Sequence, residues 1–316
     1  MTELHLHARI PDTLAGQRLD QALAVLFSDY SRSRLQTWIR AGSVRLDGVV
    51  LLRPRDQVRG GEEVDVAAEL RTETPWAPES IPLTVVYADS ALLVINKPAG
   101  LVVHPAAGNH QGTLVNALLH YAPELAMLPR AGLVHRLDKD TTGLLVVART
   151  LVAHHALVEQ LKDREFMREY EAVVNGVVVA GGKVDAPLGR HPVDRKRMAV
   201  VSAVGGRHAV THYRVVHRFA AHTHLRLHLE TGRTHQIRVH MTHLRYPLVG
   251  DPVYSGRPRL PPLCSPTLAA ALQGFGRQAL HAIRLGLTHP LTGETLLWEA
   301  PLPVDMVQLL ELLAAG

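Results

Sequence analysis

The densest group of reactive side chains in the sequence lies at residues 135–143, which read HRLDKDTTG. The stretch combines an imidazole, a guanidinium, two carboxylates and two hydroxyls with a glycine. An ionised carboxylate in such a loop can add to a carbon or shield a cation. Val- and Leu-rich runs on either side, at residues 133–134 and 144–148, predict buried strands. Two such strands would hold the loop rigid enough to aim a side chain.

Two simpler interpretations of this loop compete with catalysis. An Asp-rich loop ending in Thr-Thr-Gly is typical of a plain turn, in which the side chains bond to backbone N–H groups, and the pattern alone favours this. In a calcium loop, Asp138, Asp140, Thr142 and Gly143 would occupy the first, third, fifth and sixth places. The twelfth place is then Arg149, where a bidentate Glu is needed. We therefore reject calcium, and the turn remains the alternative.

Composition bounds the class of protein. With 316 residues and 47% hydrophobic content, the chain can form one large core and a small module. A net charge of +5 gives a mild preference for polyanions. Cys264 is the only cysteine, which excludes an internal disulfide and fits a reducing cytoplasm. The sequence shows no signal peptide and no apolar run long enough to span a membrane.

Twenty histidines raise the question of a metal site. The densest groups contain none of the His-Glu-x-x-His spacing, and a single Cys excludes a multi-Cys zinc site. We interpret most of these histidines as surface or loop residues and expect no bound metal. The groups in question comprise His154, His155, His235, His240 and His243.

The N-terminal stretch predicts a small module over residues 14–70. Residues 18–26 show helical spacing of Leu, and a second helix is expected from an N-cap at Ser31 to Gly42. The turn at Asp47 and Gly48 predicts a hairpin, and a further strand is expected around residues 64–66.

Positive charge is concentrated within this module. Residues 31–59 carry seven Arg and no Lys against two Asp, a balance of +5. Guanidinium forks match phosphate oxygens, so this favours phosphate binding over a merely solvated helix face. The RNA-binding candidates are Arg32, Arg34, Arg40 and Arg45.

A second, larger module is expected after a Pro-containing linker at residues 71–82. It would run from residue 83 to the end. Its strands and helices alternate without regular βαβ repeats, which predicts an α+β fold. The expected strands are residues 92–95, 170–174, 210–216 and 225–229; the expected helices are residues 115–121, 150–162, a segment after Thr234, and 305–313.

Four motifs in this module resemble those of the ribosomal large-subunit class of pseudouridine synthases, in the family's order. They are residues 96–105 (NKPAGLVVHP), residues 135–143, residues 169–174 (EYEAVV) and residues 231–240 (TGRTHQIRVH). The first module resembles the S4 RNA-binding domain, so the similarity covers nearly the whole chain. It implies an S4-like domain at residues 1–75 and a catalytic domain at 83–316, with a large mixed, mostly antiparallel sheet and a central cleft.

The resemblance implies an isomerase that converts uridines of 23S ribosomal RNA to pseudouridine, with the helix 69 loop as the expected target. It implies no metal or organic cofactor. We expect a cytoplasmic monomer that acts on ribosomal RNA or on a pre-50S particle. Two alternatives stay open: a synthase of the same class acting on another rRNA or tRNA site, and a non-catalytic RNA-binding assembly factor.

The resemblance also implies residue roles. Asp138 would be the catalytic carboxylate, attacking C1′, attacking C6, or promoting loss of the C2′ proton. Arg238 is the expected partner of Asp138. Arg233 is the runner-up for that role, with phosphate binding to the substrate as its alternative. Tyr170 would stack on the uracil and relay a proton at C5.

Substrate contacts complete the expected site. Arg136 would fill the gap left by a flipped uridine. Lys97 and His104 would grip the RNA backbone, and Ile237 would line the substrate site. Further cations expected to contact RNA are Arg190, Arg195, Lys196 and Arg197.

Overall fold

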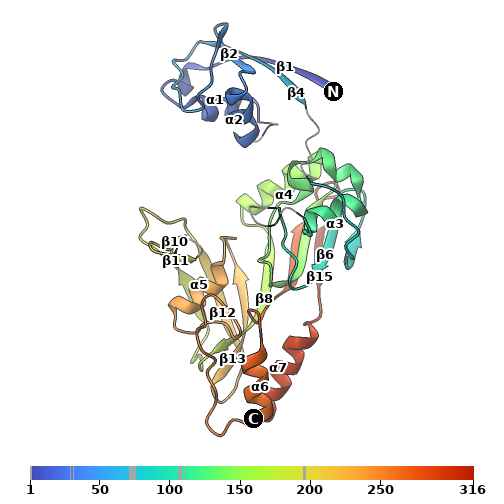
Figure 1. The fold of residues 1–316 in the computed structure, drawn as a ribbon, viewed down its shortest axis with the longest axis vertical. Helices are drawn as coiled ribbons and strands as arrows, with labels where there is room; N and C mark the ends of the chain where they lie inside the picture. The colour runs from blue at the N-terminus through green and yellow to red at the C-terminus, as the bar shows by residue number, and fades with distance from the viewer. Residues whose placement is uncertain are drawn as a thin grey trace. The chain divides into compact units, whose positions relative to one another are not determined.

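The computed structural model describes residues 2–28, 30, 32–70, 76–105, 109, 111–194 and 197–316. The chain forms two compact units, Met1–Pro75 and Trp76–Gly316, which are described separately (Figure 1). The N-cap expected at Ser31 and the cations Arg195 and Lys196 lie outside the described residues.

The first unit is a four-stranded antiparallel sheet with two helices, in the strand order β1-β4-β2-β3. The expected hairpin is present, because Asp47 and Gly48 both take the left-handed conformation (φ 49° and 78°) that a two-residue turn requires. The elements are β1 (Thr2–Arg9), η1 (Asp12–Leu14), α1 (Leu19–Leu26), α2 (Arg32–Arg40), β2 (Val44–Leu46), β3 (Val49–Val50) and β4 (Glu63–Leu70).

Strand β1 extends this unit beyond the expected core of residues 14–70. It pairs with β4 along its whole length, from Thr2 opposite Leu70 to Arg9 opposite Glu63. Such a pairing joins residues more than fifty positions apart, so no local pattern announces it. The helices bury Leu19, Leu23, Leu35 and Ile39 against the sheet.

The second unit is built on a nine-stranded sheet with the order β5-β6-β7-β14-β8-β13-β12-β9, and β15 also pairs with β14. All strand pairs are antiparallel except β7 with β14, which confirms the α+β class and the mixed, mostly antiparallel sheet. The strands are β5 (Val85–Ala88), β6 (Leu92–Lys97), β7 (Thr142–Ala148), β8 (Met167–Asn175), β9 (Gly182–Asp185), β12 (Val210–Arg218), β13 (His222–Leu229), β14 (Leu280–Thr288) and β15 (Thr295–Glu299).

Helices and a short hairpin complete this unit. The helices expected near residues 115–121, 150–162 and 305–313 are present as α3, α4 and α7. None of the helices in the described part of the chain has the length and apolar composition of a membrane span. The elements are α3 (Leu114–Tyr121), η2 (Pro123–Met127), η3 (Pro129–Gly132), α4 (Leu151–Lys162), β10 (Leu188–Arg190), β11 (Met198–Val200), α5 (Gln236–His243), α6 (Pro266–Gly274) and α7 (Val304–Ala315).

The stretch at residues 76–82 is not a linker, contrary to expectation. Trp76 packs edge-on against His104 with ring centroids 4.7 Å apart. Asn116 Nδ2 donates to the Ala77 carbonyl at 2.8 Å, and Glu79 N–H donates to the Asn116 carbonyl at 3.0 Å. A Pro-containing segment can lie extended against a domain and bond to it, which composition alone does not reveal. Residues 71–75 lie outside the described part of the chain.

The strand expected at residues 133–134 is also absent. Leu133 forms one isolated bridge to Val147, and the next N–H of the neighbouring strand, that of Val146, donates to His135 Nε2 at 3.1 Å. An imidazole therefore takes the place of a strand carbonyl. Burial lowers the pKa of His135 to about 3, which keeps that nitrogen an acceptor.

The loop at residues 135–143 leads into β7, and its last residue, Gly143, lies against β14. Its φ is 112°, and a Cβ atom there would lie 2.3 Å from the Ala282 carbonyl oxygen. Only glycine permits this approach at the point where the two parallel strands meet.

Candidate active site

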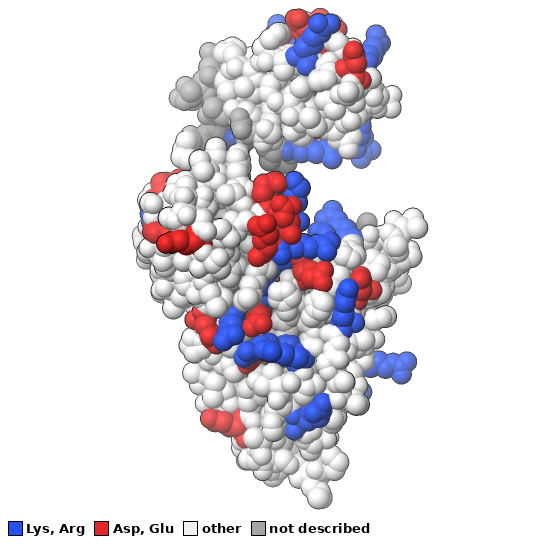
Figure 2. Space-filling model, turned by 180° about the vertical axis from the view of Figure 1, so that it is seen from behind, with Lys and Arg blue, Asp and Glu red and all other residues white. Residues whose placement is uncertain are grey.

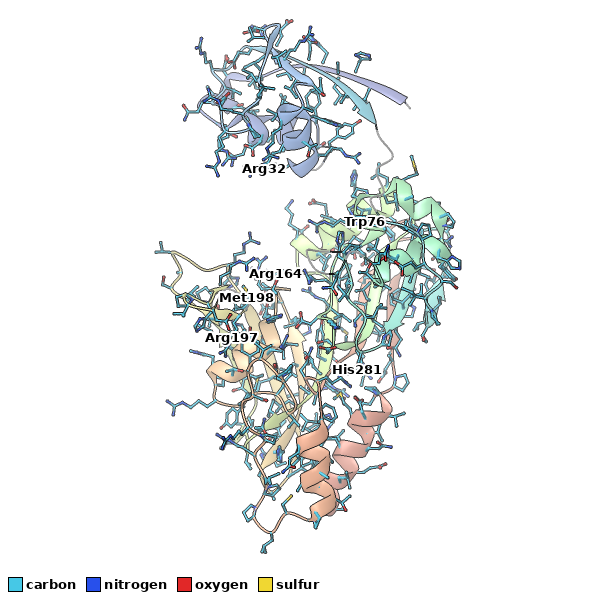
Figure 3. The ribbon with its side chains drawn as sticks, in the orientation of Figure 1. Arg32, Trp76, Arg164, Arg197, Met198 and His281 are labelled. Atoms are coloured by element: carbon cyan, nitrogen blue, oxygen red, sulfur yellow. The ribbon has the colours of Figure 1, made fainter. Side chains whose placement is uncertain are left out.

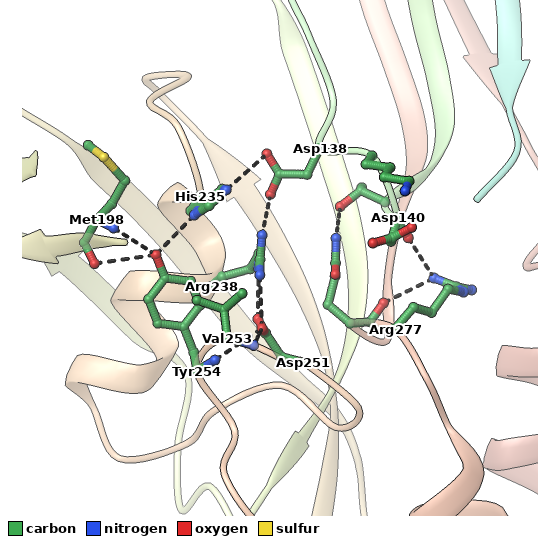
Figure 4. A network of polar contacts seen from close by, with 12 residues as sticks. Asp138, Asp140, Met198, His235, Arg238, Asp251, Val253, Tyr254 and Arg277 are labelled. Carbon is green, nitrogen blue, oxygen red and sulfur yellow. Dashed lines mark hydrogen bonds and ion pairs between the residues drawn. The ribbon is translucent and has the colours of Figure 1, made fainter. Parts of the chain in front are cut away.

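The Asp138 carboxylate belongs to the polar network drawn in Figure 4, where dashed lines join it to His235 and Arg238. Arg238 Nη1 donates to its Oδ2 at 3.0 Å, and His235 Nε2 lies 4.0 Å from its Oδ1. The side chain is 17% exposed, so a ligand can reach it. Of the two arginines considered, Arg238 is thus the one beside Asp138, while Arg233 is exposed and donates from Nε to the His208 carbonyl.

Arg238 bridges two carboxylates. It lies on α5 with 5% of its side chain exposed. Its Nε and Nη2 donate to the two oxygens of Asp251 at 2.7 and 2.8 Å, so the two-pronged face of the guanidinium is turned to Asp251. Burial acts to lower the pKa of Arg238, but the bonds and charge of Asp251 and the charge of Asp138 outweigh it and raise that pKa.

Asp251 is a member of the site that sequence reasoning missed. Its side chain is fully buried, and Oδ1 also accepts from the N–H groups of Val253 (2.9 Å) and Tyr254 (3.1 Å). The Asp follows Gly250, whose φ of 70° and contact with the Arg277 carbonyl require glycine. An Asp bonded to the next N–H groups is a turn signature, which by itself gives no hint of a partner on α5.

Tyr170 lies on β8 in the same core cluster as Ile237, and both side chains are buried. Burial raises the pKa of the Tyr170 phenol; Arg168 opposes this, and the charge of Asp138 adds to it. The phenol therefore carries its proton at neutral pH.

Arg168 supports the chain at the start of the motif at residues 231–240. It is buried, and its Nη2 donates to the carbonyl of Glu230 at 3.2 Å. A Cβ atom on Gly232 would lie 2.8 Å from Arg168 Nη1, so the glycine lets this loop pass over the guanidinium. Burial lowers the pKa of Arg168.

Several contacts fix the backbone of the loop that carries Asp138. Arg277 donates to the Asp140 carbonyl at 3.2 Å, a contact drawn in Figure 4. The same guanidinium also donates to both carboxylate oxygens of Asp305. Further anchors are Lys97 Nζ to the Lys139 carbonyl (2.8 Å), Gln278 Nε2 to Thr141 Oγ1 (3.0 Å), and Thr142 Oγ1 with His281 Nδ1 (2.8 Å).

Lys97 differs from its expected role in gripping RNA. It is 1% exposed, and its ammonium group donates to the carbonyls of Pro98, Leu101 and Lys139. Burial, helped by Arg277, lowers its pKa to about 8 against the opposing charges of Asp140 and Asp138. Lys97 therefore positions the loop, and it is too deeply buried to reach a phosphate.

We expect Lys97→Met to destabilise the protein and to slow the reaction more than it weakens RNA binding. Each carbonyl left without a donor costs about 1–3 kcal/mol.

The pH dependence of the free energy of unfolding has a definite sign. Because the folded pKa of about 8 lies below 10.5, the unfolded chain binds more protons between these values, and the stability of the wild type rises with pH there. Denaturant unfolding at pH 7.5 and pH 10 should show the gap between wild type and variant widening, by up to about 3 kcal/mol. A gap that narrows would contradict this account.

Two exposed cations belong to the motifs that carry the site. Arg136 and Arg233 are exposed, and Arg136 has no hydrogen-bond partner among the described residues. On the face seen in Figure 2, Lys and Arg side chains stand among Asp and Glu, so positive charge is interspersed and forms no single patch.

The remaining residues expected to contact RNA differ in their exposure. His104 is partly buried, with Nδ1 3.0 Å from the Pro105 carbonyl and its ring against Trp76. Arg190 is exposed. Arg197 is partly buried, with its guanidinium 5.1 Å from the centre of the Tyr254 ring.

The four arginines expected to bind RNA in the first unit are all exposed: Arg32, Arg34, Arg40 and Arg45. Arg32, labelled in Figure 3, also donates to the fully buried Asp20 at 2.9 Å. Part of its charge is thus used inside the unit. Burial acts to raise the pKa of Asp20, but bonds from Gln36, Arg32 and Arg18 lower it overall.

Two family models match the chain. The RNA pseudouridylate synthase model matches residues 91–243, which contain Asp138, Tyr170 and Arg238. The S4 domain model matches residues 17–64. Both fall within the two compact units of the structure.

Known proteins resemble the chain over nearly its whole length. Ribosomal large subunit pseudouridine synthase D of Pseudomonas aeruginosa is 59% identical, over 97% of this chain and 95% of that protein. The protein of the same name from Escherichia coli K12 is 55% identical, over 99% and 95%. Among solved structures, human RNA pseudouridylate synthase domain containing 4 is 29% identical with a TM-score of 0.58, over 73% of this chain and 93% of that one. The chain therefore belongs to the pseudouridine synthase family of isomerases.

Proposed function

We propose that the protein converts specific uridines of large-subunit ribosomal RNA to pseudouridine, with Asp138 as the catalytic carboxylate. The observation that carries the proposal is the placement of this carboxylate. It is held by a buried guanidinium and stays within reach of a ligand. Relatives at 55–59% identity bear the name of a ribosomal large subunit synthase, which supports the RNA class.

The reaction needs no oxidant or reductant. The bond from N1 to C1′ breaks, the uracil turns, and a bond from C5 to C1′ forms. One proton leaves C5 and one is gained at N1, so atoms and charge balance. In all three routes considered above, the ionised Asp138 carboxylate acts at the ribose or the uracil. Tyr170 would lie against the ring and relay the C5 proton.

The uridine must leave its stack before it can reach Asp138. In this proposal Arg136 fills the vacated position and Arg233 contacts the RNA backbone, and the exposure of both side chains supports these roles. We further propose that residues 1–75 act as an S4 RNA-binding domain and residues 76–316 as the catalytic domain. The expected substrate is the helix 69 loop, in free rRNA or a pre-50S particle, and the protein would act as a cytoplasmic monomer.

Site mapping tests the proposal directly. The purified protein would be incubated with rRNA from a host that lacks its own enzyme, and pseudouridine would be mapped at nucleotide resolution. We expect new pseudouridines in the helix 69 loop. Modification at another rRNA site or in tRNA would favour the same-class alternative. Tight binding without any pseudouridine would overturn the enzymatic proposal in favour of an assembly factor.

The S4-like unit gives a separate prediction about salt dependence. Arg40→Gln combined with Arg45→Gln should weaken RNA binding and flatten the plot of log affinity against log salt. The slope should fall by about 0.7–0.9 for each phosphate that the double variant no longer binds. Lys162→Gln, at an exposed position on α4 paired with Glu159, is a control that removes a single exposed positive charge from the second unit, and it should leave the slope unchanged. An unchanged slope in the double variant would remove these two arginines from the interface.

A further inference from the structure

His235 occupies an unusual backbone position beside Asp138. It is the N-cap of α5 and has a φ of 57°, in the left-handed region. Its ring is 20% exposed and lies between two polar groups. On one side, Nδ1 is 2.9 Å from the Tyr254 hydroxyl; on the other, Nε2 is 4.0 Å from Asp138 Oδ1. Figure 4 shows this line of groups.

The Tyr254 hydroxyl has one proton to give, and its neighbours decide where that proton points. The Met198 N–H donates to the phenol oxygen at 2.9 Å. Two acceptors then compete for the hydroxyl proton: His235 Nδ1 at 2.9 Å and the Met198 carbonyl at 3.3 Å. The shorter contact favours donation to His235 Nδ1.

The same conclusion follows from the other side of the ring. If Nδ1 accepts a proton from Tyr254, the neutral imidazole carries its own proton on Nε2. That N–H then faces the Asp138 carboxylate. In the opposite tautomer, the Nε2 lone pair would face a carboxylate oxygen, which is repulsive. Both neighbours therefore select the Nε2–H form.

We infer that His235 is a positioning residue for Asp138: Met198 and Tyr254 hold its neutral ring in the Nε2–H tautomer, and this N–H closes onto Asp138 Oδ1 when RNA binds. The inference deepens the proposed function and rests on the role of Asp138. At 4.0 Å the contact is not yet a hydrogen bond. Catalytic bonds are often long without substrate and shorten in the complex.

A second donor is needed because Arg238 alone does not fix the carboxylate. Its guanidinium gives Asp138 one bond and gives Asp251 two. A single bond to Oδ2 leaves the carboxylate able to turn about it. Donation from His235 to Oδ1 would fix the plane of the group and direct its remaining lone pairs at the nucleotide.

The neutral form of His235 suits this task. Burial lowers the pKa of His235, and the Arg238 and Arg136 charges act in the same direction, against Asp138 and Asp251. An imidazolium beside Asp138 could pass its proton to the carboxylate. A neutral N–H orients the carboxylate and leaves its negative charge intact.

Nitrogen NMR tests the tautomer without reference to activity. The ¹⁵N resonances of an imidazole distinguish Nε2–H, Nδ1–H and charged rings. A difference spectrum against His235→Gln would identify His235 among the twenty histidines. We expect the neutral Nε2–H form, and a weaker preference for it in Tyr254→Phe, where only Asp138 still selects this tautomer. A charged ring or an Nδ1–H ring in the wild type at pH 7.5 would overturn the inference.

Single-turnover rates with bound RNA test the positioning role. His235→Leu and Tyr254→Phe should each slow the step by about ten- to a hundredfold with RNA affinity unchanged. His235→Gln keeps an N–H donor and should recover most of the rate. Adding Tyr254→Phe to His235→Gln should cost little more, because an amide has no tautomer to select. Equal losses from Tyr254→Phe in both backgrounds would indicate a merely structural Tyr254.

Controls separate the possible failures. His120→Gln and Tyr121→Phe, at exposed positions on α3, should behave as wild type. Asn accepts the left-handed backbone, so the melting temperature of His235→Asn shows whether loss of the ring itself unfolds α5. If Asp138→Asn is inactive while His235→Leu keeps the full rate, the inference falls and the proposed function stands. If Asp138→Asn is active, the proposed function itself falls.

Discussion

Asp138→Asn should fold normally and form no pseudouridine, with a single-turnover rate below about 1% of wild type. Asn has nearly the shape of Asp but carries no charge. It can neither add to a carbon as a carboxylate does nor shield a developing sugar cation. Its amide oxygen can still accept the hydrogen bond from Arg238 Nη1. We therefore expect the loop at residues 135–143 to keep its conformation.

Folding of this variant is protected by the rest of the network. Arg238 keeps its two bonds to Asp251, and the loop keeps its anchors from Lys97 and Arg277. The melting temperature should therefore change little, and RNA affinity should be retained. A loss of activity with these two quantities unchanged assigns the defect to the chemical step.

Asp140→Asn is the matched control, because it removes the same charge two residues further along the same loop. The structure ties Asp140 down through its backbone carbonyl, which the substitution leaves in place. We expect most of the activity to remain. Residual turnover above a few percent in Asp138→Asn, together with an inactive Asp140→Asn, would transfer the catalytic role to Asp140.

Local periodicity correctly predicted those elements in which the spacing of apolar residues matches the burial seen in the structure. The alternation at residues 225–229 appears in β13, where Leu225, Leu227 and Leu229 are buried and the two residues between them are less so. Helices α4 and α7 follow their apolar spacing in the same way, with buried residues three or four positions apart. Pattern works here because one face of each element meets the core and the other does not.

Strand β14 shows where pattern fails. It lies mid-sheet between β7 and β8 and is buried on both faces over most of its length. Alternation is then lost, since both sets of side chains face protein. His281 on this strand contacts Thr142 at the start of β7 and so helps to hold the loop that carries Asp138. No pattern in the residues of β14 predicts that position.

The residues of the site fall into two groups, those that a motif predicts and those that only folding brings together. Motif types located Asp138, Tyr170 and Arg238, because each lies in a contiguous run of recognisable residues. Asp251 and Tyr254 join the network only through folding, since one pairs with Arg238 and the other with His235. Lys97 was misassigned for a related reason: a sequence gives its charge but not its burial.

The second large effect is expected from Arg238→Lys. Lys keeps one positive charge but loses the planar fork, and the structure makes that loss severe. The guanidinium holds three bonds to two carboxylates, and a compact ammonium cannot reach both in the same geometry. Each lost charge-assisted bond is worth roughly 1.5–3 kcal/mol, about one to two orders of magnitude in rate when the bond serves the transition state.

Stability should fall as well, because Asp251 is fully buried. In Arg238→Lys its carboxylate would keep the N–H groups of Val253 and Tyr254 but lose the bidentate partner. We expect a drop of about 1–3 kcal/mol in the free energy of unfolding. Adding Asp251→Asn should recover part of this stability, because no buried charge is left unpaired, without restoring the rate.

Arg233→Lys is the matched control, since it makes the same substitution five residues earlier at an exposed position. If Arg233 contacts the RNA backbone, the variant should bind RNA more weakly and react at a near-normal rate once saturated. Rates at saturating enzyme, affinities, and unfolding curves would be measured for both variants. A near-normal rate for Arg238→Lys beside a collapsed rate for Arg233→Lys would show that the bridge between Asp138 and Asp251 does not serve the reaction.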